Sequence, residues 1–170
     1  ITALYGTFNG GKGNDYISIG NNGGMIDEMP KPINGNNTFI FNLGDGQDTI
    51  EDTTVGILKD SNDNNWFGIG ASEHINIIRF GADIKQEMIK FRIDNQNGDL
   101  IIIIGDQGDQ ITVKGYLSSE YGNKKYHFEF ADGAIWEDIR WGLPTVEQQA
   151  TAGDDNIYGS QISDTIHGGD

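Results

Sequence analysis

A nine-residue segment near the N-terminus, residues 10–18, constrains the fold of this chain most strongly. It reads GGKGNDYIS and matches the pattern G-G-x-G-x-D-x-U-x, in which U is a large apolar residue, at every specified position. Glycine reaches backbone conformations that are closed to other residues, so the segment can form a tight turn whose carbonyl oxygens point inward. The alternation that follows predicts a short strand at residues 16–19, with Ile17 and Ile19 on one face.

This turn gathers the oxygen ligands that a hard cation prefers. Ca2+ takes six to eight oxygens, from backbone carbonyls and carboxylates together. Asp15 adds a charged oxygen to the carbonyls of Gly11 and Gly13. One turn supplies about half of such a shell, so the segment predicts that a second turn stacks on the first and that the two share an ion.

Glycine-rich turns alternate with short candidate strands throughout residues 1–52. Turns are expected at residues 10–15, 20–24, 34–37 and 44–48, with strands at 16–19, 25–29, 38–42 and 49–52. Such alternation predicts a parallel β-roll, in which odd-numbered turns stack on one edge and even-numbered turns on the other. We therefore expect turn 10–15 to stack on turn 34–37 and turn 20–24 to stack on turn 44–48, with one calcium ion in each pair.

The candidate ligands in this region are glycines and residues with oxygen-bearing side chains. They are Gly11, Gly13, Asp15, Gly23, Asn34, Asn37, Gly44, Gly46 and Asp48. Asn37 stands where the pattern has an aspartate, and its neutral amide oxygen binds calcium more weakly. Ordinary hairpin turns remain the alternative for these segments. Residues 60–65, DSNDNN, resemble the first half of an EF-hand loop but lack its glycine and its final glutamate, so a solvated loop is expected there.

From residue 73 to residue 141 the pattern changes to longer strands. Strands are expected at residues 74–80, 89–93, 100–104, 111–113 and 126–130, and the Asp132-Gly133 pair predicts a hairpin after the last of them. Residues 84–88 and 136–140 are each expected to form a helical turn. The sequence thus predicts that residues 53–149 form a compact, β-rich and mostly antiparallel module with an apolar core of its own.

Nine-residue spacing returns at residues 150–170. The step Asp155-x-Ile157 recurs as Asp164-x-Ile166, and residues 168–170 open another repeat. We interpret this region as the start of a second β-roll, with Gly153, Asp155, Asp164 and Gly169 as calcium ligands. Because the chain begins and ends inside repeats, we expect it to be part of a longer protein.

Composition narrows the classes of partner. The chain has 26 acidic and 11 basic residues, a formal net charge of -15, which argues against nucleic acid and anionic membranes and favours bound cations. The absence of cysteine excludes disulfides and thiolate zinc sites. No apolar run of about 18 residues predicts a membrane-spanning helix.

These motifs resemble the RTX (repeats-in-toxin) family of bacterial proteins exported by type I secretion. The nonapeptides at both ends resemble RTX repeats. The intervening stretches NNTFIFNLGDGQDTIED (36–52), GDLIIIIGDQGDQITVKGYL (98–117) and FEFADGAIWEDI (128–139) resemble the haemolysin-type calcium-binding-related domain. The resemblance implies export into a calcium-rich medium, folding there, and stacking on neighbouring repeats of the parent chain.

No constellation of catalytic residues stands out, and His74, His127 and His167 are interpreted as structural or solvated strand residues. We therefore expect a non-catalytic, all-β, calcium-binding structural module of a secreted RTX protein or toxin. The alternative is an extracellular adhesion module that presents Trp66 or Trp136 to a glycan or host surface; together with Trp141, these side chains are most simply core or edge residues.

Overall fold

The structure, a computed structural model, describes residues 2–3, 6–20, 36–53, 57–59, 65–67, 75–94, 96–117, 125–137, 146–149 and 164–167. Within these ranges the regular elements are β-strands, apart from one 3₁₀ turn, η1 (Gln86–Met88). The expected all-β class is thus confirmed for this part of the chain, and η1 lies within the helical turn expected at residues 84–88. No helix in the described ranges is long and apolar enough to span a bilayer.

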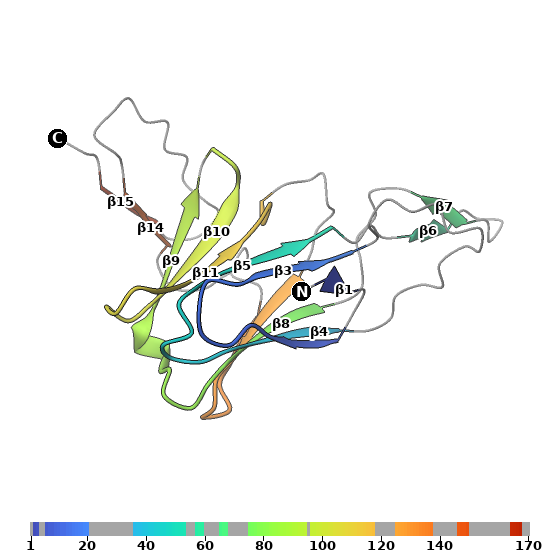
Figure 1. The fold of residues 1–170 in the computed structure, drawn as a ribbon. Coiled ribbons are helices and arrows are strands. Elements are labelled where there is room, and N and C mark those ends of the chain that lie inside the picture. The colour runs from blue at the N-terminus through green and yellow to red at the C-terminus, as the bar shows by residue number, and fades with distance from the viewer. Residues whose placement is uncertain are drawn as a thin grey trace.

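Two sheets make up the body of the molecule, one above the other in Figure 1. The larger, sheet A, has the order β1 (Thr2–Ala3), β3 (Tyr16–Ile19), β5 (Gln47–Asp52), β11 (Asp109–Val113), β10 (Asp99–Ile104), β9 (Ile89–Asp94), β14 (Val146–Gln149) and β15 (Asp164–His167). The smaller, sheet B, has the order β13 (Ile135–Trp136), β12 (Lys125–Glu129), β8 (Ile75–Phe80), β4 (Asn37–Phe41) and β2 (Thr7–Asn9). A separate antiparallel ribbon pairs β6 (Ile57–Lys59) with β7 (Asn65–Phe67).

Successive strands near the N-terminus alternate between the two sheets. Strands β2 and β4 pair in parallel within sheet B, while β3 and β5 pair in parallel within sheet A. Thr7 lies opposite Thr38, 31 residues later, and Tyr16 lies opposite Thr49, 33 residues later. The turn at residues 10–15 therefore stacks on the turn at residues 42–46, and the predicted stacking of residues 10–15 on residues 34–37 is wrong.

Within residues 53–149 most of the described strand pairs are antiparallel, as expected, but strands of this region also pair in parallel with strands of residues 37–52, so both sheets are mixed. Strand β10 is antiparallel to both β9 and β11, and β13 is antiparallel to β12. However, β11 is parallel to β5, and β8 is parallel to both β4 and β12. The short glycine turns produce the antiparallel pairs, whereas the parallel pairs join strands separated by long crossovers, as parallel pairing requires.

One core fills the space between the sheets, because alternate residues of each strand point inward. From sheet A the buried residues include Ile17, Ile19, Ile50, Phe91, Leu100, Ile102, Ile104, Ile111 and Val113, and from sheet B they include Phe8, Phe39, Phe41, Ile78, Phe80, Tyr126 and Phe128. Residues on both sides of the predicted boundary at 52–53 thus contribute to the same core. Tyr126, Phe128 and Phe130 share the buried face, as expected, but Trp136 lies in β13 rather than in a helical turn.

A chain of buried polar side chains links the two sheets. Asn76 Nδ2 in β8 donates to Asp52 Oδ2 in β5 at 2.7 Å, and Asn37 Nδ2 in β4 donates to Asn76 Oδ1 at 3.0 Å. Asn37 Oδ1 in turn accepts from the backbone N–H of Gly6 at 3.2 Å. Buried polar groups are tolerated when they are hydrogen-bonded, so these side chains specify how the two sheets align.

Candidate metal site

Three glycine-containing turns lie at one end of sheet A. They precede β3, β5 and β11 and comprise residues 10–15, 42–46 and 105–108; because these strands are parallel neighbours, the turns stack in that order. Backbone bonds join the layers. Gly13 N donates to Asp45 O at 2.7 Å, Thr49 N donates to Asp15 O at 2.8 Å, and Gln110 N donates to Gly46 O at 2.9 Å. Each turn has an aspartate at its end: Asp15 is the last residue of the first turn, Asp48 follows the second, and Asp109 follows the third.

Asp48 lies between the first and second turns. Its Oδ1 accepts a hydrogen bond from the backbone N–H of Asp15 at 3.0 Å, and only 5% of the residue is exposed. Burial raises the pKa of Asp48, the bond from Asp15 opposes that rise, and the negative charges of Asp15, Asp45 and Asp109 add to it. Three carboxylates are therefore close enough to repel that of Asp48, and a cation would offset this repulsion.

Asp109 makes the corresponding contact one layer further on. Its Oδ2 accepts from Gly44 N at 2.6 Å and its Oδ1 accepts from Gly46 N at 3.1 Å. Gly44 and Gly46 have φ angles of 85° and 104°, a region that other L-residues rarely enter. Glycine is therefore favoured at positions 44 and 46, because the backbone conformation that points these two amides at the Asp109 carboxylate requires positive φ.

Asp15 provides the clearest test of whether the site suits a cation. Its Oδ2 is buried and accepts no hydrogen bond from the residues that the structure describes. Gly10 covers this oxygen so closely that a Cβ at position 10 would lie 2.8 Å from it. A buried carboxylate oxygen without a donor is costly, whereas oxygen is the ligand that calcium takes. In this respect the residues fit Ca2+.

Side-chain carboxylates alone do not complete such a site. Among the described side chains, no group of three or more histidines or acidic residues is arranged to hold a metal ion. Asp45 Oδ2 already accepts from Asn42 N at 2.8 Å and from Asn42 Nδ2 at 3.1 Å. Backbone carbonyls of the turns therefore have to supply part of any coordination shell.

The structure brings together six of the predicted ligands in the first two turns and the strand that follows them: Gly11, Gly13, Asp15, Gly44, Gly46 and Asp48. Asn37 lies elsewhere, buried within β4 and bonded to Asn76 and Gly6. Gly23, Asn34, Gly153, Asp155 and Gly169 lie outside the described residues, and Asp164 is described only as backbone in β15.

Asp45 and Asp109 also belong to this carboxylate group, although neither was among the predicted ligands. The signal for Asp109 is present, since GDQGDQI at residues 105–111 resembles GDGQDTI at residues 44–50. The similarity was overlooked because residues 44–50 were assigned to the N-terminal roll and residues 105–111 to the central module.

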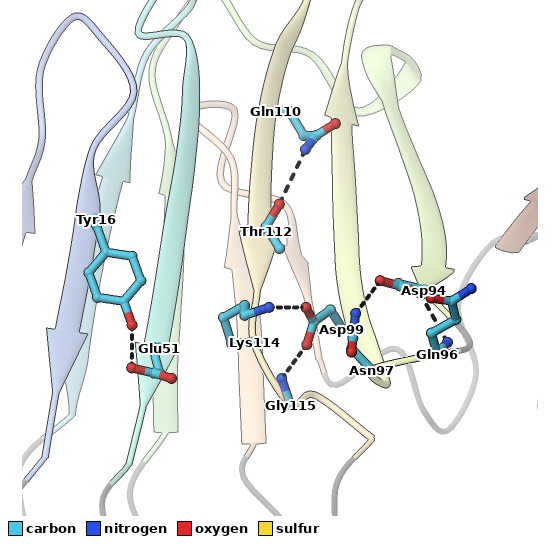
Figure 2. Close-up of polar contacts among 10 residues, drawn as sticks. All are labelled: Tyr16, Glu51, Asp94, Gln96, Asn97, Asp99, Gln110, Thr112, Lys114 and Gly115. Atoms are coloured by element: carbon cyan, nitrogen blue, oxygen red, sulfur yellow. Dashed lines mark hydrogen bonds and ion pairs between the residues drawn. The ribbon is translucent and has the colours of Figure 1, made fainter.

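Away from the stacked turns, another aspartate binds the two residues that follow β11, as Figure 2 shows. Asp99, at the start of β10, accepts from Lys114 Nζ at 2.6 Å and from Gly115 N at 2.7 Å. The bond to Asp99 raises the pKa of Lys114. The same outer face of sheet A carries a bond between Tyr16 and Glu51. These contacts join neighbouring strands of sheet A. They do not involve the carboxylates of Asp15, Asp48 and Asp109 at the stacked turns.

Trp136, one of the three tryptophans considered for glycan stacking, is half-buried. Its ring packs against Phe130 and Phe91, with centroids 4.7 and 6.1 Å apart, and its Nε1 donates to Gln86 Oε1 at 3.0 Å. The side chains of Trp66 and Trp141 lie outside the described residues. Trp136 is therefore part of the core margin.

Comparisons with known proteins point to the same chemistry. Residues 99–138 match the model of the haemolysin-type calcium binding protein related domain. Over 138 residues the chain is 29% identical to the iron-regulated protein FrpA of Neisseria meningitidis serogroup C. That alignment covers 78% of this chain and 10% of FrpA, so the chain spans about a tenth of the length of this relative. The family match includes β10, β11, β12 and β13.

Proposed function

We propose that this chain is a calcium-binding structural module of a secreted bacterial RTX protein or toxin, and that its turns fold on binding calcium outside the cell. The observation that carries the proposal is the buried Oδ2 of Asp15, which accepts no hydrogen bond from the described residues, in a residue whose N–H bonds Asp48. The match of residues 99–138 to a calcium-binding-related domain and the similarity to FrpA support it.

In this proposal Asp15 and Asp48 supply carboxylate oxygens, and the carbonyls of Gly11, Gly13, Gly44 and Gly46 supply neutral ones. Bound Ca2+ would contribute two positive charges and accept several of these oxygens at once. Asp15 N holds Asp48 in place, and Gly13 N holds the neighbouring turn through Asp45 O. Without a cation, the burial of the Asp48 carboxylate, which raises its pKa, and the repulsion from Asp15, Asp45 and Asp109, which adds to that rise, both work against stacking of the turns.

Parallel pairing near both ends of the described chain favours roll-like stacking. At the C-terminal end, β14 pairs with β15 so that Val146 lies opposite Asp164. The separation of 18 residues equals two nonapeptides, which is the spacing that a roll of alternating turns requires. We extend the proposal to Gly153, Asp155, Asp164 and Gly169 as ligands of further sites, with neighbouring repeats of the parent chain as stacking partners.

Modest ion affinity is sufficient for such a role. Extracellular calcium modules bind with dissociation constants of about 10⁻⁴ to 10⁻³ M. A site at tenfold excess of ligand adds about 1.4 kcal/mol to the free energy of unfolding. Since domains are stable by only about 5–15 kcal/mol, a few sites decide whether the turns fold. We propose that the module itself is non-catalytic and that any activity of the parent protein lies elsewhere.

Circular dichroism and calorimetric titration test this function. We expect the chain in millimolar Ca2+ to melt at a higher temperature than in chelator, and calorimetry to give saturable binding. Mg2+ at the same concentration serves as the control, because its smaller, octahedral shell suits these turns poorly. Identical spectra and melting temperatures with and without Ca2+ would remove the basis of the proposal.

A further inference from the structure

Asp109 connects two parts of the chain that are distant in sequence. It lies at the start of β11, inside the segment that matches the calcium-binding-related domain. Its two carboxylate oxygens accept from amides 65 and 63 residues earlier, those of Gly44 and Gly46. Only 4% of Asp109 is exposed. The contact is thus a buried, charge-assisted pair of bonds, stronger than bonds between neutral groups.

The turn that receives these bonds is fixed from both sides. Asp109 holds its amides on one side, and turn 10–15 packs against it on the other. A Cβ at Gly46 would lie 2.4 Å from Gly13 O, so the two turns are in direct backbone contact. The position of Gly46 relative to Gly13 and Asp15 therefore depends on how Asp109 holds turn 42–46.

We infer that Asp109 is a positioning residue for the calcium site. Its carboxylate binds the amides of Gly44 and Gly46 and so fixes the position of the turn that faces Asp15. This inference rests on the proposed calcium function. It assigns a task to the family-matched segment, because that segment orders the second turn without supplying a ligand to the first pair of turns. Binding at Asp15 and ordering of residues 99–113 are then thermodynamically coupled, and the coupling is reciprocal.

Asparagine at position 109 would change this pair of bonds directly. It would remove the negative charge of Asp109 and keep one acceptor, but its amide group would face one of the two glycine N–H groups. The turn would lose one of its two hydrogen bonds to residue 109, because a glycine N–H would then face the asparagine NH₂ group, which is itself a donor.

The chain offers a matched control for the test. Asp106 lies in the turn before Asp109, is exposed, and has its carboxylate bonded by the neighbouring Gln107. Asp109→Asn and Asp106→Asn remove the same charge from the same region. Calorimetric titration with Ca2+ is expected to give a dissociation constant at least about fivefold higher for Asp109→Asn, in the range typical of coupled sites. Asp106→Asn should stay within about twofold of wild type.

Ile102→Val controls for loss of stability alone, because it trims the core of β10 and leaves Asp109 intact. Its dissociation constant should match that of wild type at temperatures where both are folded. Equal dissociation constants for Asp109→Asn and Asp106→Asn would overturn the inference and leave the calcium function standing. A wild-type chain without saturable Ca2+ binding would overturn both.

Amide hydrogen exchange in the wild-type chain keeps the test independent of whether the variants fold. Added Ca2+ is expected to slow exchange at Gly44 and Gly46 and also at amides of β10 and β11. Protection confined to residues 10–20, with β10 and β11 unchanged, would contradict the coupling.

Discussion

The backbone N–H of Asp15 donates to Oδ1 of Asp48 at 3.0 Å, across 33 residues of sequence. Two aspartates that follow equivalent glycine turns are thus adjacent in neighbouring layers, and one side chain is ordered by the backbone of the other. A cation placed between these layers meets oxygens from both. The relationship makes each aspartate separately testable.

Removing the charge of Asp15 should reduce the effect of calcium on stability. Asp15→Asn replaces the carboxylate, whose buried Oδ2 has no donor among the described residues, by a neutral amide. If one site at tenfold excess of Ca2+ is lost, the gain in the free energy of unfolding falls by about 1.4 kcal/mol. For a chain of this size that corresponds to about 3–6 °C of the calcium-induced rise in Tm. Differential scanning calorimetry with chelator and with Ca2+ measures it.

Glu137→Gln is the control for this experiment, since it removes one charge from an exposed residue beyond β13. It should retain the full calcium-induced rise in Tm. Equal rises for Asp15→Asn and Glu137→Gln would exclude Asp15 as a ligand.

Asp48 should make the calcium-free protein sensitive to pH. Its folded-state pKa is raised above 3.8, chiefly by burial and further by its acidic neighbours. The folded state therefore binds more protons than the unfolded state just above pH 3.8, and the free energy of unfolding falls as pH rises through that window. Asp48→Asn lacks this contribution and keeps an oxygen for the N–H of Asp15. In chelator at neutral pH the variant should be at least as stable as wild type, whereas in saturating Ca2+ it should be less stable.

Urea unfolding at pH 4 and pH 7, with and without Ca2+, tests whether Ca2+ reverses the order of stability of Asp48→Asn and wild type. A variant less stable than wild type at pH 7 in chelator would show that the charge of Asp48 is compensated within the protein itself.

Two glycines of one turn should differ in their tolerance of alanine. Both have positive φ, which costs an L-residue about 1–2 kcal/mol. A Cβ at Gly44 meets nothing within 4 Å, whereas one at Gly46 would lie 2.4 Å from Gly13 O. Gly46→Ala should therefore destabilise the chain by about 1–3 kcal/mol more than Gly44→Ala. Chemical denaturation compares them, and equal losses would mean that the first two turns are not in contact.

The polar chain between the sheets should contribute strongly to stability. Asn76→Ala removes the acceptor for Asn37 Nδ2 and the donor to Asp52 Oδ2. The buried Nδ2 of Asn37 then loses this acceptor, which costs about 1–3 kcal/mol. Asn97→Ala is the control, because Asn97 also bonds an aspartate, Asp94, but is exposed. The control should stay within about 0.5 kcal/mol of wild type, and a similar loss for both variants would contradict the role assigned to burial.

Local pattern was enough to predict most strands. The strand at residues 16–19 is predicted with its observed bounds, and those near residues 75–80, 89–94 and 99–104 differ by one residue at an end. Alternation and apolar runs report directly on which faces are buried, as the burial of Ile17 and Ile19 illustrates. Glycine spacing also placed Asp15 and Asp48 beside glycine turns, where the structure has them, because it reports on backbone conformation.

Pairing between distant strands was not predictable in this way. Counting turns at residues 20–24 and 34–37 as separate layers placed Asp15 next to Asn37, whereas Asp15 lies next to Asp48. Register depends on which connection returns to which sheet, and that information is not local. Asn37 illustrates the result, since its oxygen-bearing side chain serves the contact between sheets rather than the turns.

The position of β5 between β3 and β11 has a consequence for partial chains. Both of its long sides are hydrogen-bonded, on one side by a neighbour from the first twenty residues and on the other by a neighbour beyond residue 100. A fragment ending before β10 would present the open side of β5 as an unpaired edge, the kind of surface that recruits strands from other molecules. A truncated chain that ends at residue 98 should therefore self-associate more readily than the full chain.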